Sequence, residues 1–112
     1  MNERGGEAED RVKYARYLQG LLRSGAEPFY QNSARADMRR HQVNAADIKS
    51  CLRKCEVTSL AWRASGDMEL VCIGETRQQD EMEVQLRISE SEGVPMLKVT
   101  AVNALTHRKE DI

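Results

Sequence analysis

The sequence predicts an α+β domain in which two to three N-terminal helices pack on a four-stranded antiparallel sheet. Apolar residues recur at spacings of three and four up to about position 55, and at a spacing of two beyond it. Short polar segments separate the later apolar stretches, and no internal repeat or long linker divides the 112 residues. Because segments with a helical period precede segments with a strand period, the chain fits one α+β domain with segregated helices and strands.

The first ten residues are polar and contain Gly5-Gly6. We therefore expect a flexible N-terminus over residues 1–8, one domain over residues 9–106 and a C-terminal tail over residues 107–112.

The first predicted helix runs from Glu9 to Ser24. Gly25 and Pro28 follow it and end it. Its apolar side chains fall on one stripe, which is typical of an amphipathic helix. They are Val12, Tyr14, Ala15, Tyr17, Leu18, Leu21 and Leu22.

Two shorter helices are predicted next. Asn32 or Ser33 is the expected N-cap of a helix that continues through Arg40. Asn44 is the expected N-cap of another, in which Asp47 lies near the positive helix end. Its apolar stripe is Ile48, Cys51, Leu52 and Cys55.

Four strands are predicted after position 55, joined by short polar connections that favour an antiparallel meander. Their ranges are 57–63, 68–73, 82–88 and 96–102. The run Met68 to Ile73 is nearly all apolar and is expected to be buried on both faces. In the last strand Lys98 is expected on the face opposite Leu97, Val99 and Ala101.

Cys51, Cys55 and Cys72 are an odd number of cysteines, and no apolar run reaches the length of a membrane span. These features indicate a cytoplasmic protein with reduced thiols and no membrane association. Cys51 and Cys55 share a helix face as small buried hydrophobes or, alternatively, as a metal or redox pair. Neither histidine has zinc-ligand spacing to the cysteines, so we expect no metal and no cofactor.

The net charge of −1 hides a strong segregation of sign. Residues 11–54 carry a net charge of +7 and residues 55–95 carry −6. Basic helices that neutralise an acidic sheet would explain this pattern, and so would a surface that binds a polyanion.

The segment from Asn32 to Val43, followed by Ala46-Asp47-Ile48 and Glu56-Val57, resembles a bacterial family of small domains of unknown function. That family has the motif His-Ala-x-x-Arg-Met-x-x-Arg-x-Ile before a helix and a sheet. The family is similar to the RelE and MqsR type of toxins, which cleave messenger RNA. Ala34, Met38 and Val43 match the motif, whereas Ser33 stands in place of His and His41 in place of Arg.

The resemblance implies a RelE-like fold and a metal-independent ribonuclease site, in which cationic side chains stabilise the phosphorane and a base activates the ribose hydroxyl. The implied catalytic residues are His41, Lys98 and Arg87. Further candidates for the same chemistry are Arg63, Arg77 and His107. The implied nucleic-acid-binding residues are Arg35, Arg39, Arg40, Lys49, Arg53 and Lys54.

Two functions follow from these features. The first is a non-catalytic module that binds a protein partner and has lost the polar site of the family, because the substitutions fall where the chemistry would be. The alternative is a toxin-like RNA-binding protein or ribonuclease. The first helix is either a docking surface for the partner or a cover for the sheet of its own chain. A homodimer through a strand edge also stays open.

Overall fold

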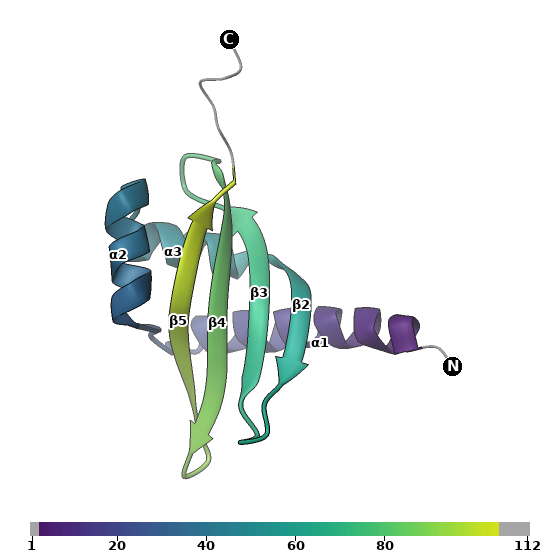
Figure 1. Ribbon diagram of the computed structural model, residues 1–112. Coiled ribbons are helices and arrows are strands. Elements are labelled where there is room, and N and C mark those ends of the chain that lie inside the picture. Colours follow the sequence, from purple (N-terminus) through teal and green to yellow (C-terminus); the bar gives the residue numbers. More distant parts are fainter. Residues whose placement is uncertain (1–2, 106–112) are drawn as a thin grey trace.

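The computed structural model describes residues 3–105, with side chains from Ala8 onward, and confirms the α+β class (Figure 1). Three helices pack on a five-stranded, mostly antiparallel sheet. The elements are α1 (Glu3–Arg23), β1 (Phe29–Tyr30), α2 (Asn32–His41), α3 (Ala45–Arg53), β2 (Glu56–Trp62), β3 (Met68–Glu75), β4 (Glu81–Ser91) and β5 (Val94–Ala104).

The sheet has the strand order β1-β5-β4-β3-β2. Its four long strands form the predicted antiparallel meander. The fifth strand, β1, was not predicted. It pairs parallel to β5, with Phe29 opposite Lys98 and Tyr30 opposite Val99. Two residues are too short to produce a periodic pattern, so only the tertiary contact reveals this strand.

The connection between β4 and β5 is tighter than predicted. Glu92 and Gly93 both have positive φ angles, 55° and 79°. Two consecutive residues of this kind form the hairpin turn that matches strand twist. The strands therefore continue to Ser91 and resume at Val94, beyond the predicted strand limits at residues 88 and 96.

Helix ends follow the predictions in part. Helix α1 begins at Glu3 instead of Glu9. Helix α3 has the predicted N-cap, because Asn44 and Asp47 form a reciprocal capping box. The prediction for α2 was wrong: Gln31 occupies its N-cap without a side-chain hydrogen bond. Ser33 instead donates its hydroxyl to the carbonyl oxygen of Thr100, 2.8 Å away.

The helices cover one side of the sheet. Helices α1 and α3 lie behind the four long strands, and α2 lies along the β5 edge (Figure 1). Leu18 of α1 is fully buried and Leu22 nearly so, which shows that this helix covers the sheet of its own chain. The core between the layers is aliphatic and includes Ile48, Leu52, Leu70, Val84, Leu86 and Val99.

A close approach fixes α3 against β3. A Cβ atom added to Gly74 would lie 2.4 Å from the carbonyl oxygen of Cys51. Real Cβ atoms do not approach so closely, so this position requires glycine. The sulfur of Cys51 also lies 3.7 Å from the carbonyl oxygen of Met82, which ties the same helix to β4.

The prediction for the faces of β3 was wrong, and the prediction for β5 holds for Leu97 and Val99 but not for Ala101. Strand β3 alternates, with Leu70 and Cys72 buried but Val71 and Ile73 only half-buried, so one of its faces is open. In β5 an irregularity at Thr100 changes the register, and Ala101 pairs with Gln85. Since a bulge shifts the alternation by one residue, Ala101 joins Lys98 on the open side and Val102 enters the core.

Among the described residues, no helix is both long enough and apolar enough to cross a bilayer.

Candidate functional site

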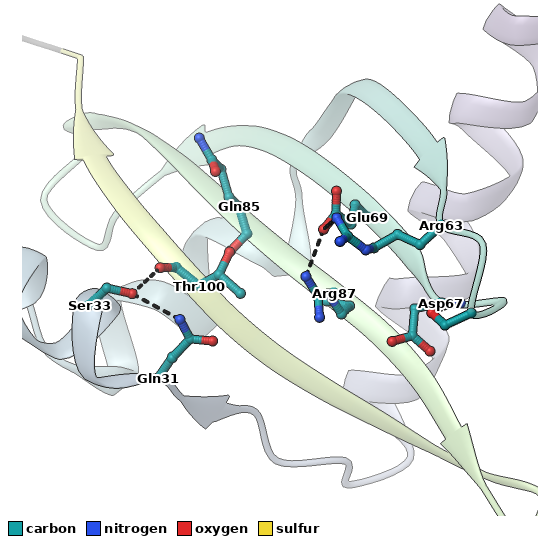
Figure 2. A network of polar contacts seen from close by, with 9 residues as sticks. Gln31, Ser33, Arg63, Asp67, Glu69, Gln85, Arg87 and Thr100 are labelled. Carbon is teal, nitrogen blue, oxygen red and sulfur yellow. Dashed lines mark hydrogen bonds and ion pairs between the residues drawn. The ribbon is translucent and has the colours of Figure 1, made fainter.

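The side of the sheet opposite α1 and α3 is the candidate site, and we call it the open face. No described helix lies over the four long strands on this side (Figure 1). Its residues alternate with the buried core residues of β3, β4 and β5. Figure 2 shows that several of their polar side chains project from the sheet as one group. The open face comprises Glu69, Val71, Ile73, Glu83, Gln85, Arg87, Lys98, Ala101 and Asn103.

Glu69 is the centre of an ion network on this face. Its Oε2 atom lies 2.9 Å from Nη2 of Arg87 and 2.9 Å from Nη1 of Arg63 (Figure 2). The hydrogen bond from Arg87, helped by the charge of Arg63, lowers the pKa of the Glu69 carboxyl. One carboxylate therefore binds both guanidinium groups, and both arginines point toward a residue of their own chain.

Arg87 and Lys98, two of the three predicted catalytic residues, lie directly opposite each other on β4 and β5. The Nε atom of Arg87 is buried and has no hydrogen-bond partner. No described side chain forms an ion pair with Lys98. Phe29 is in register with Lys98 on β1 and is 59% exposed. The structure thus forms a row in which one aromatic ring and two cations are neighbours.

His41, the third predicted catalytic residue, borders the open face. It is the last residue of α2 and lines two hollows, one with Asp47 and Arg77 and one with Gln85 and Asn103 of the open face. Neither Arg87 nor Lys98 lines either hollow. A general acid or base must come within hydrogen-bond reach of the reacting group. His41 thus shares no hollow with the two predicted catalytic cations.

The larger hollow beside His41 has a volume of about 510 Å³. Asp47 is buried at its base, where it accepts a hydrogen bond from the backbone N–H of Asn44 and pairs with Nε of Arg77 at 3.1 Å. Both carboxylate oxygens thus hold the start of α3 and the β3–β4 loop together. Arg77, a further candidate from the sequence, has a structural role here.

The predicted nucleic-acid-binding residues are divided between α2 and α3. Arg35 donates to the carbonyl oxygen of Tyr30, Arg40 pairs with Asp37, and Lys49 pairs with Glu27. The other three residues of this group are Arg39, Arg53 and Lys54, which are exposed. Of the remaining candidates, Arg63 belongs to the Glu69 network, and His107 lies outside the described residues.

Two polar residues of α2 within the motif-like segment, Ser33 and Asp37, hold the edge of the sheet. Besides the bond from Ser33, the Oδ2 atom of Asp37 accepts the backbone N–H of Val102 at 2.9 Å. That bond lowers the pKa of the Asp37 carboxyl, helped by Arg40 and opposed by partial burial. The serine that stands in place of the motif histidine thus has a structural partner, and these contacts close the β5 edge to another strand.

All three cysteines are free and buried. Burial raises the pKa of the Cys51 thiol to about 12, so this sulfur is neutral at physiological pH. Within residues 3–105, no three His, Cys, Asp or Glu side chains converge as a metal site requires.

Aromatic side chains also gather on the covered side, where α1 meets β2. Tyr14 contacts Tyr17 and Trp62 edge to face, with ring centroids 6.0 and 5.8 Å apart. Trp62 is 58% exposed, and the group borders a hollow of about 470 Å³ that also includes Glu90. This hollow contains none of the predicted site residues.

Sequence reasoning missed Glu69, Gln85 and Asn103. Glu69 is the one charged residue inside the apolar run Met68 to Ile73. A carboxylate in an otherwise apolar strand marks the face that is not buried, and this signal would have found both the open face and the centre of its network.

Comparison of the chain with family models, with curated proteins and with solved structures finds no match. The function must therefore be argued from the geometry of the site.

Proposed function

We propose that this chain is a cytoplasmic, non-catalytic module that binds a protein partner through the open face. The observation that carries this proposal is the Glu69 network. Catalysis needs charged groups that converge on a reacting atom, but here Arg63 and Arg87 converge on a carboxylate of the same chain. His41, the proposed acid or base, lies at the end of α2, outside this network.

A mixed charge pattern supports a protein partner over a nucleic acid. The open face carries Glu69 and Glu83 as well as Arg87 and Lys98. A phosphate backbone selects a continuous cationic surface, because affinity comes largely from released counterions. Protein interfaces, in contrast, commonly combine charges of both signs with aromatic residues. The open face has both signs of charge, and the aromatic ring of Phe29 lies beside them.

RNA binding by a RelE- and MqsR-like chain is the second candidate, and one observation favours it. Phe29, Lys98 and Arg87 form a row in which a base can stack on the ring while the cations contact phosphates. This row contains Arg87 and Lys98, two of the three catalytic residues that the family resemblance implies.

Site-specific photo-crosslinking in cells tests the proposal. A benzoylphenylalanine is introduced at Phe29 on the open face and, as a matched control, at Val12 on α1, which is 54% exposed. We expect protein adducts from position 29 that disappear on Lys98→Glu, and none from position 12. Adducts that ribonuclease removes would establish the RNA candidate instead. Equal labelling from both positions would refute an open-face interface.

Induced expression tests the lack of catalysis separately. We expect growth at the uninduced rate and intact bulk messenger RNA, with no difference between the wild type and the His41→Ala or Lys98→Ala variants. Growth arrest that either substitution relieves would overturn the non-catalytic assignment.

A further inference from the structure

The charges of the open face are separated along the strands. Arg87 and Lys98 lie toward one end of the sheet, whereas Glu83 and Glu75 lie toward the other. Within the described part of the chain, no ion pair engages Lys98, Glu75 or Glu83. Arg87 bonds to Glu69 through Nη2 only. This face therefore presents unpaired charge of opposite sign at its two ends.

Strand register arranges the centre of the open face as three rows of three residues across β5, β4 and β3. Each row crosses the strands at paired positions, so neighbours in a row are lateral neighbours in the sheet. The rows are Lys98, Arg87, Glu69; then Ala101, Gln85, Val71; then Asn103, Glu83, Ile73. Gln85 is the central residue of this grid.

We propose that a second copy of this chain occupies the open face, related to the first by a twofold axis that lies between the two sheets. The inference rests on the proposed function and names the partner. When this axis runs across the strands above Gln85, the first row of the grid lies over the third row of the other copy, strand by strand. Arg87 then lies opposite Glu83 of the second copy, and Gln85 lies opposite its own counterpart.

Lys98 adds to this match. The same axis places it opposite Asn103 of the second copy, beside the carboxylate of Glu83 in the same row. Glu69 lies opposite Ile73 of that copy and keeps its own partners, Arg63 and Arg87. Since a twofold interface is self-complementary, each favourable pair occurs twice.

The geometry of stacked sheets allows these contacts. Two sheets pack face to face at about 10 Å with their strands within about 30° of alignment. Arginine, lysine and glutamate side chains from both sides can meet across that gap. Because basic and acidic residues lie toward opposite ends of the strands, a second copy with reversed strands places a basic end over an acidic end on both sides of the axis.

The apolar content of the interface is small, because Val71, Ile73 and Ala101 are its only aliphatic residues within the grid. Association should therefore be weak, at roughly micromolar dissociation constants or above, and should depend on salt.

Sedimentation equilibrium of the full chain tests this proposal. Lys98→Glu brings a second carboxylate beside Glu83, and Glu83→Lys places a cation opposite Arg87, each of them twice in the dimer. Each variant alone should therefore dissociate at least about tenfold more readily than the wild type. An equal mixture of the two variants should form a heterodimer, because one face has become more acidic and the other more basic. Arg53→Glu on α3, away from the open face, is the matched control and should leave the dimer unchanged.

Circular dichroism of each variant confirms that the fold is retained. A wild type that remains monomeric at sub-millimolar concentration, or a dimer that neither reversal weakens, would overturn the second copy. The outcomes separate the two proposals. A monomer that still crosslinks to another protein from position 29 removes the second copy but keeps the binding module, whereas a monomer without such adducts removes both.

Discussion

The two faces of one sheet differ completely in chemistry, although the same strands form them. On the covered face Leu70, Val84 and Val99 belong to the core between the sheet and the helices and are almost fully buried. On the open face the adjacent residues are Glu69, which bonds to Arg87, and Gln85 and Lys98, which are at least partly exposed. One face is apolar and buried, and the other is polar and accessible.

The two faces also differ in how much each side chain contributes to the free energy of unfolding. Burial of a Leu or Val side chain contributes about 1.5–3 kcal/mol, whereas an exposed ion pair contributes about 0–1 kcal/mol. The covered face therefore determines stability, and the open face is free to change without unfolding the domain. Substitutions on one strand can test this division directly.

The largest difference is expected between neighbours on β3. Leu70→Ala should destabilise the fold by about 3 kcal/mol, because it removes buried methyl groups and leaves a cavity. Val71→Ala, one residue away on the open face, should cost less than about 1 kcal/mol. Urea unfolding of both variants at a concentration that keeps the chain monomeric measures the pair. Equal losses would show that the open face is also part of the core.

A second test concerns the close approach of α3. Gly74→Ala should cost about 2 kcal/mol, because the new Cβ meets the backbone of Cys51 and the layers must separate. Gly20→Ala is the control, since its added Cβ meets only the end of the Arg23 side chain. That substitution should stabilise α1 by about 0.5–1 kcal/mol. Thermal unfolding of both variants gives the comparison, and the two substitutions must have opposite signs.

The contact between Asp37 and the edge of the sheet should make stability depend on pH. Asp37→Ala should cost about 1–2 kcal/mol, because the N–H of Val102 loses a charged acceptor. The folded-state pKa of this carboxyl lies below its ordinary value. Its contribution is therefore complete above the unfolded-state pKa of about 3.9 and disappears as the pH falls through the lower folded-state pKa.

Unfolding of the wild type and of Asp37→Ala as a function of pH measures this contribution. Their difference should shrink in acid, and Asp37→Asn should lie between them at neutral pH. A difference that is independent of pH would contradict the role of the carboxylate.

The smallest effect on stability is expected within the open-face network. Arg63→Gln should change the free energy of unfolding by less than about 0.5 kcal/mol, because Arg63 and Glu69 are both well exposed. Urea unfolding checks this value at low and high salt. A loss above about 1.5 kcal/mol would mean that the network stabilises the fold, contrary to the division between faces.

Long periodic segments carried most of the fold in the sequence. The change of period near position 56, the four-stranded meander and the N-cap at Asn44 are all local signals, and all are confirmed. β1 and the irregularity at Thr100 depend on contacts between distant residues and were missed. The wrong N-cap of α2 has the same origin, because the hydroxyl of Ser33 bonds to β5 instead of its own helix.

The candidate site was predictable to a smaller extent. Arg87 and Lys98 lie together because the alternation of apolar residues in β4 and β5 fixes the register of these strands. The sequence shows this alternation, although it does not give the register itself. The position of His41 depends on where α2 packs, and no local pattern encodes that. Glu69 was missed because its neighbours from Met68 to Ile73 are apolar, which is typical of a strand that is buried on both faces.

Hydroxyl-radical footprinting across a range of protein concentrations tests the central claim most directly. Phe29 and Met96 are exposed on the open face, whereas Val12 and Trp62 are exposed on the side where α1 lies, and all four are more than half exposed. We predict that oxidation of Phe29 and Met96 falls as the concentration of the chain rises, while Val12 and Trp62 do not change. Protection of Trp62 with continued oxidation of Met96 would contradict the account, because the contact would then lie on the covered side.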